Sequence, residues 1–147
     1  MHNVQELIKE VLEEGYLLSL ATVDDGGVWV SDVIYVYDDQ MNIYWLSQIS
    51  ARHSKAISKN NQVAGTITIS NKPEEKNIGL QLKGVAEKID GDILEIAVKH
   101  RQKRGKPAPT KLGEILDQGE SWYRLRPKMI ELIYEPLFGF EKPKIEL

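Results

Sequence analysis

The chain has 147 residues, of which 41% are hydrophobic and 28% charged, with a formal net charge of −3 and no cysteine. This length and balance predict one globular domain, residues 1–147. The missing cysteine excludes disulfides, Cys-ligated zinc, iron–sulfur clusters and thiol catalysis, and the acidic balance argues against binding of nucleic acid or membranes through the whole surface.

The N-terminal segment predicts a helix and not a signal peptide, because it is acidic and periodic. Apolar residues recur at helical spacing from Val4 to Leu12, Asn3 and Glu6 have the spacing of a capping box, and Gly15 would end the helix. No apolar run in the chain approaches the ~20 residues of a membrane span. We therefore expect a cytoplasmic protein without membrane contact.

Strand patterns follow the helix. The N-terminal half predicts strands over 16–23, 28–37 and 43–47, joined by turns, and then a short polar helix at about 51–60.

The C-terminal half continues in the same way. It predicts strands over 62–70, 78–89, 121–126 and 129–134, with helical patterns at about 92–104 and on to about 117. Pro127 fits an edge or a bulge. Hairpin-joined strands with few helices predict a mainly β, α+β fold: a small closed antiparallel barrel with helices outside it.

The predicted helix at 51–60 carries cations at the end that normally favours anions. Arg52 and His53 fall in its first turn, and the surrounding segment 40–73 contains no acidic residue. A helix N-terminus with exposed N–H groups and an arginine is a suitable phosphate site, to which Ser47 could add a hydroxyl. A solvated basic helix explains the pattern about as well, and a packed neutral histidine at position 53 is a further alternative.

Three segments occur in unbroken order over about residues 3–90: ATVDDGG, DVIYVYDDQMNIYWLSQISARHSKAISKNNQVAGTI and LQLKGVAEKI. With WYRLRPKMIELI as a weaker C-terminal match, they resemble the FMN-binding split-barrel family related to pyridoxamine 5′-phosphate oxidase. The resemblance implies a six-stranded antiparallel split barrel and a homodimer with FMN at the subunit interface. It also implies a flavin-dependent oxidoreductase that acts on an unknown small molecule.

The resemblance also assigns roles to individual residues. Arg52 and His53 match the basic pair that binds the FMN phosphate, and Ser47 matches a hydroxyl that assists it. Gln81 matches the strand that supplies a polar contact to the cofactor, with Gly79 as the alternative position of that contact. The strand that lies along the flavin ring, partly through its backbone, corresponds to Asp32, Val33, Ile34 and Tyr35.

Departures from the oxidase pattern concern the substrate. Ser31 stands where the oxidases have a basic residue, Ile133 where they have a tryptophan, and LFGFEKPK where they have an Arg-x-His motif. We therefore do not predict pyridoxamine phosphate oxidase activity. The alternatives are a non-enzymatic flavin or haem protein, with His53 or His100 as axial ligand, and an F420-dependent reductase.

The strongest basic run is KHRQKRGK, residues 99–106. Its cations would complement the dipole at a helix C-terminus, or they would contact a phosphorylated substrate near the flavin. The three histidines show no metal-ligand spacing, so we predict no metal site.

Overall fold

The computed structural model of this chain describes residues 2–90, 93–108 and 119–147. In these residues the helices are α1 (Val4–Glu14), α2 (Arg52–Lys59), α3 (Leu94–Lys103) and α4 (Glu135–Phe138). The strands are β1 (Leu17–Asp24), β2 (Gly27–Ile34), β3 (Val36–Tyr37), β4 (Ile43–Gln48), β5 (Gln62–Thr68), β6 (Ile78–Ile89), β7 (Glu120–Tyr134) and β8 (Lys144–Glu146). The helical pattern predicted up to residue 117 lies outside the described residues from 109 onward.

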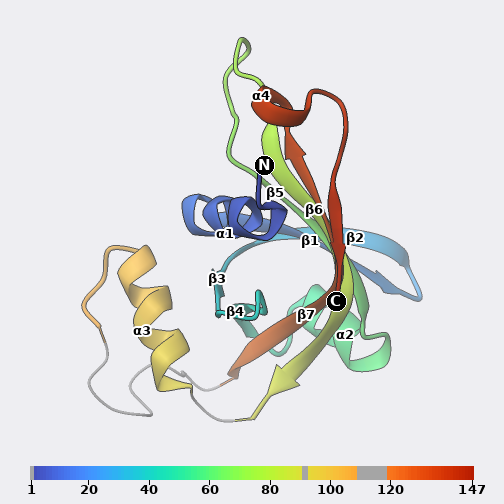
Figure 1. Cartoon of the computed structure of the whole chain (residues 1–147). Helices are drawn as coiled ribbons and strands as arrows, with labels where there is room; N and C mark the ends of the chain where they lie inside the picture. The colour runs from blue at the N-terminus through green and yellow to red at the C-terminus, as the bar shows by residue number, and fades with distance from the viewer. Residues whose placement is uncertain (1, 91–92, 109–118) are drawn as a thin grey trace.

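The strands form one curled antiparallel sheet in the order β2-β1-β5-β6-β7-β4-β3, and β8 pairs with β7 (Figure 1). This confirms the mainly antiparallel β fold with flanking helices and agrees with a split barrel. The described residues contain eight strands instead of the six that the resemblance implies. Two short strands, β3 and β8, account for the difference.

The predicted strand 28–37 is divided at Tyr35. Its first part, β2, pairs with β1, whereas β3 pairs with β4 at the other end of the strand order. The Tyr35 side chain is fully buried and its hydroxyl donates to the Leu12 carbonyl oxygen at 2.7 Å. The continuous β pattern of residues 28–37 therefore contains a change of strand partner. As a result, one chain segment connects the two ends of the strand order.

The strands predicted at 121–126 and 129–134 are one strand, β7, which pairs with β6 from Trp122 to Tyr134. The register shifts between Lys83 and Gly84, opposite Pro127, which confirms the bulge predicted at the proline. A Cβ at Gly84 would collide with the carbonyl oxygen of Arg126, so only glycine fits this crossing.

Two apolar clusters hold the helices on the sheet. The apolar face of α1 packs into the main core through Ile8, Val11 and Leu12, and Asn3 caps this helix by accepting from the Glu6 N–H at 3.2 Å, as predicted. The second cluster joins α3 to β3, β4 and β7 and consists of Val36, Tyr44, Ile96, Ala97 and Trp122.

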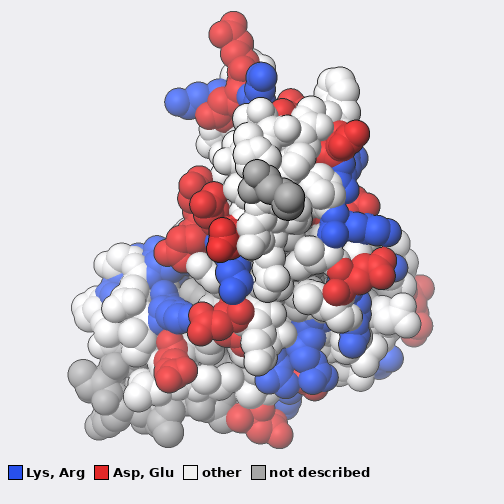
Figure 2. Space-filling view, viewed as in Figure 1, with Lys and Arg blue, Asp and Glu red and all other residues white. Residues whose placement is uncertain are grey.

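The surface is mixed in charge. Lys and Arg side chains alternate with Asp and Glu on the face shown in Figure 2. Among the helices of the described residues, none has the length and apolar character that crossing a membrane requires.

Candidate functional site

The end of β4 and the start of α2 bring two of the predicted phosphate ligands together. Ser47 Oγ lies 2.9 Å from His53 Nε2. The His53 ring is half-buried, and this burial lowers its pKa below the ordinary value, so the imidazole is neutral at neutral pH. Arg52 is its chain neighbour in the same first turn, and Ser47, Arg52 and His53 are together called the phosphate cluster below.

Arg52 has a counter-ion that the sequence did not indicate. Its Nε donates to Asp24 Oδ2 at 2.8 Å and its Nη2 donates to Oδ1 at 3.0 Å, while the guanidinium lies 4.3 Å from the centre of the Trp29 ring. The hydrogen bond to Arg52 lowers the pKa of Asp24. The local sequence around Arg52 lacks an acid, but the β1–β2 hairpin supplies one from 28 residues away.

The first turn of α2 is open to an anion. Ser50 belongs to a residue type that often caps helices, yet Ala51 takes the N-cap position, and no described side chain caps this turn. No acidic residue lies in the turn either. Because the first N–H groups of a helix lack intrahelical partners, they add partial positive charge beside Arg52 and His53.

The strand predicted to lie along the flavin ring offers mainly its backbone. The side chains of Val33 and Tyr35 are buried, and Ile34 is half-buried. Asp32 is exposed on the outer face and accepts a hydrogen bond from Ser19 Oγ at 2.6 Å. Because β2 ends the strand order, alternate N–H and C=O groups of this strand point away from β1.

Two cations of the 99–106 run hold α3 beside this strand. The Lys99 Nζ donates to the Tyr37 carbonyl oxygen at 3.1 Å, and the Lys103 Nζ donates to the Tyr35 carbonyl oxygen. Lys103 also lies 3.6 Å from the Tyr35 ring centre, and burial lowers its pKa to about 8. Both lysines line a cavity of about 410 Å³ between α1, β3 and α3. Lys99 and Lys103 therefore anchor α3 to the backbone of residues 35–37.

His100 is a packed neutral side chain. It is 4% exposed, and its ring meets the Trp122 ring edge-on with 5.3 Å between centres. Burial is the largest cause that lowers its pKa to about 4, whereas a hydrogen bond with the Ile34 backbone acts in the opposite direction. A position this enclosed suits packing better than axial ligation of haem.

We expect this histidine to make the protein less stable in acid. Its folded pKa of about 4 lies below the ordinary 6.5, so the unfolded chain binds the proton more readily between these values. The stabilisation is complete above pH 6.5 and is lost as the pH falls toward 4, by at most about 3 kcal/mol. Urea unfolding of the wild type and of His100→Phe at pH 7 and pH 4.5 measures this loss of stability in acid. Equal pH dependence in the two proteins would contradict the assignment.

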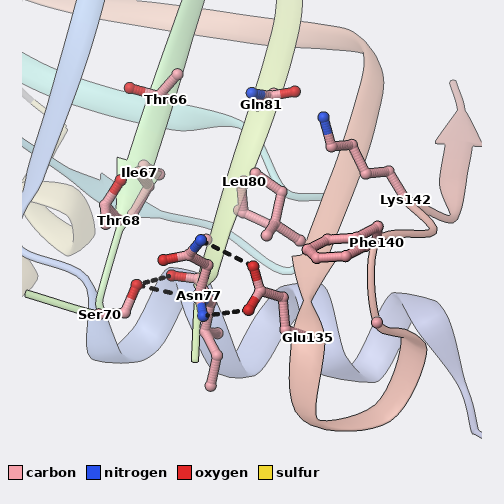
Figure 3. Close-up of a pocket in the computed structure, with 14 residues that line it drawn as sticks. Thr66, Ile67, Thr68, Ser70, Asn77, Leu80, Gln81, Glu135, Phe140 and Lys142 are labelled. Carbon is pink, nitrogen blue, oxygen red and sulfur yellow. Dashed lines mark hydrogen bonds between the residues drawn. The ribbon is translucent and has the colours of Figure 1, made fainter. Parts of the chain in front are cut away.

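Gln81 lies apart from the 32–35 segment. It faces outward in a row that crosses the sheet from Asp32 to Ser19, Thr66 and Gln81, three strand spacings or about 14 Å. It lines a cavity of about 490 Å³, in which Figure 3 shows Phe140 and Lys142 coming from the segment before β8. Within one chain, Gln81 is therefore separated from the strand predicted to lie along the flavin ring.

The family model described as pyridoxamine 5′-phosphate oxidase matches residues 4–134. A UPF0306 protein of Photorhabdus laumondii is 27% identical over 93 residues, which cover 63% of this chain and 65% of the relative. The chain thus spans slightly less than two thirds of that relative.

Solved structures share the fold. HutZ, the haem storage protein from Vibrio cholerae, superposes with a TM-score of 0.67 and 23% identity, covering 99% of this chain and 95% of HutZ. A putative pyridoxamine 5′-phosphate oxidase from Listeria innocua gives 0.70 and 14%, covering 89% and 98%. An F420 reductase gives 0.64 and 17%, covering 83% and 94%. With the family model spanning nearly the whole described sheet, the chain belongs to the pyridoxamine 5′-phosphate oxidase family.

Proposed function

We propose that this protein binds FMN and is a flavin-dependent oxidoreductase for a small molecule other than pyridoxamine phosphate. The observation that carries the proposal is the first turn of α2. It has no acidic residue and no capping side chain among the described residues, and it holds Arg52 beside the Ser47–His53 pair. A phosphate monoester supplies the negative charge and the acceptor oxygens that such a turn lacks.

The flavin ring would lie along the 32–35 segment and meet backbone groups of Asp32 and Val33, since the backbone of the next two residues already bonds His100 and Lys103. This fits an edge strand whose Val33 and Tyr35 side chains already belong to the core. Bound flavin supplies the redox chemistry, and the chain supplies binding and orientation. Gln81 is too far along the sheet to reach a ring held at β2 of its own chain, so we assign its contact to a ring held by a second subunit.

A homodimer would complete such a site. The outer face of the β1–β2 hairpin leaves apolar side chains exposed in a single chain, with Val28 71% and Val30 59% exposed beside Leu17 and Val23. Exposed patches of this kind mark protein–protein contacts. Light scattering over a range of protein concentrations tests the proposal, and a monomer at every concentration would contradict it.

The substrate differs from that of the true oxidases. The C-terminal segment that would meet it carries Phe140 and Lys142 where the resemblance leads one to expect Arg-x-His, and Ile133 lines the same cavity. A single lysine is a point charge and lacks the planar fork with which arginine binds phosphate. The cavity therefore suits a substrate with more apolar surface and less negative charge than pyridoxamine phosphate.

Haem is the second candidate, because the HutZ structure shares the fold. Two observations lead us to favour FMN over haem. His53 Nε2 is already engaged by Ser47, and His100 lies on the buried face of α3 against Trp122. F420, a deazaflavin, would use the same phosphate cluster and the same ring surface as FMN.

The visible absorbance spectrum of the purified protein, before and after addition of FMN and removal of the excess, tests the proposal. A retained two-band flavin spectrum supports it. A Soret band after incubation with haem and no retained flavin would support the haem alternative, and retained F420 without retained FMN would support the deazaflavin alternative. An assay of NADH and NADPH oxidation then separates a reductase from a passive flavin carrier.

A further inference from the structure

The proposed phosphate site does not account for the acidic side chain that faces Arg52. Asp24 belongs to the DDGG turn between β1 and β2, and it approaches Arg52 side-on through Nε and Nη2. This is the bidentate arrangement that arginine also uses to bind phosphate. We propose that Asp24 is an internal competitor for Arg52, which an incoming phosphate must displace. The proposal rests on the proposed phosphate site.

Neighbouring groups hold the Asp24–Arg52 pair in place when no ligand is bound. The Gly26 N–H donates to Asp24 Oδ1 at 2.8 Å and fixes the carboxylate. The Trp29 ring fixes the plane of the guanidinium at 4.3 Å. A Cβ at Gly26 would lie 2.9 Å from Arg52 Nη2, so the turn backbone packs directly against the pair. The β1–β2 turn thus holds Arg52 in place. Through Asp24, the same turn also occupies the side of the guanidinium that carries Nε and Nη2.

The charges around Arg52 make coexistence of carboxylate and phosphate unfavourable. Asp24 and Arg52 cancel, and His53 adds no charge because burial lowers its pKa. A phosphate on the remaining face of the guanidinium would stand within a few Å of the carboxylate, where like charges repel. The Asp24 side chain is 23% exposed and the glycines that follow it are exposed, so the carboxylate has a path into solvent.

Competition also sets what the site accepts. A singly charged carboxylate that replaces Asp24 would exchange one ion pair for an equal one. A phosphate dianion brings more charge and a third oxygen, which can reach the free N–H groups of the α2 first turn. The internal carboxylate therefore selects phosphate esters over the monocarboxylates that are abundant around any protein.

The matched pair of variants is Asp24→Asn and Asp25→Asn. Both remove one negative charge from the same turn, but Asp25 is exposed, whereas Asp24 is the carboxylate that binds Arg52. Asparagine at 24 keeps an oxygen for the Gly26 N–H and for one arginine donor. We expect Asp24→Asn to bind FMN about three- to tenfold more tightly than wild type, whereas riboflavin, which lacks the phosphate, binds equally to both. Asp25→Asn should stay within about twofold of wild type.

Quenching of flavin fluorescence measures these affinities, and calorimetric titration with inorganic phosphate gives a readout that does not depend on FMN. Weaker FMN binding by Asp24→Asn would overturn the inference and make Asp24 a positioning residue. An equal gain of FMN affinity in Asp24→Asn and Asp25→Asn would also overturn the inference, because it would show an effect of net charge and not of the contact with Arg52. If no protein binds FMN while Asp24→Asn gains affinity for phosphate, the proposed flavin function fails and the inference stands. If Asp24→Asn fails to fold, Asp24→Ser repeats the test.

Discussion

Arg52→Ala is expected to bind FMN roughly 10- to 150-fold more weakly than the wild type, the range for loss of a hydrogen bond to a charged group. The reason lies in the first turn of α2, where Arg52 is the one fully charged donor beside the neutral His53. Removal of the guanidinium also leaves Asp24 without its partner, so a negative charge then faces the phosphate. Titration followed by flavin fluorescence gives the dissociation constants.

Lys55→Ala is the matched control for Arg52→Ala. It removes one cation from the same helix. Lys55 is exposed, however, and with Ser58 and Arg126 it lines a cavity to which Arg52 does not belong. Its effect on FMN should stay within about twofold, as for a screened surface charge. Riboflavin should bind equally to all three proteins. Unchanged FMN affinity in Arg52→Ala would remove the phosphate assignment.

Trp122→Ala is expected to lower the free energy of unfolding by about 3–5 kcal/mol, the usual cost of emptying a buried aromatic site. Trp122 has no exposed surface and lies where β7 meets α3, against Ile96, Ala97 and the edge of His100. The variant should also loosen α3, whose lysines bind the carbonyl oxygens at Tyr35 and Tyr37. Urea unfolding monitored by circular dichroism measures the change.

Phe140→Ala is the control for this variant. The Phe140 side chain is 92% exposed, so its removal should change stability by no more than about 0.5 kcal/mol. A loss below about 1 kcal/mol in Trp122→Ala would mean that α3 is not held by this cluster. Since Phe140 lines the cavity that contains Gln81, the same variant also reports whether that aromatic ring contributes to flavin or substrate binding.

The sequence by itself determined the local elements of this protein. The helical spacing of Val4–Leu12 and the capping pair at Asn3 and Glu6 define α1, because both signals act within one or two turns. The turn residues and strand periods predicted the mainly antiparallel sheet. The proximity of Ser47 and His53 is also a local property, because these residues are only six positions apart.

The tertiary structure decided which distant segments meet. The β pattern of 28–37 does not reveal that its two ends join different strands, since side-chain alternation is the same for any partner. The separation of Gln81 from Asp32 depends on strand order, and the pairing of Asp24 with Arg52 depends on where the β1–β2 hairpin lies against α2. These contacts join residues far apart in the chain, so no local period or spacing encodes them.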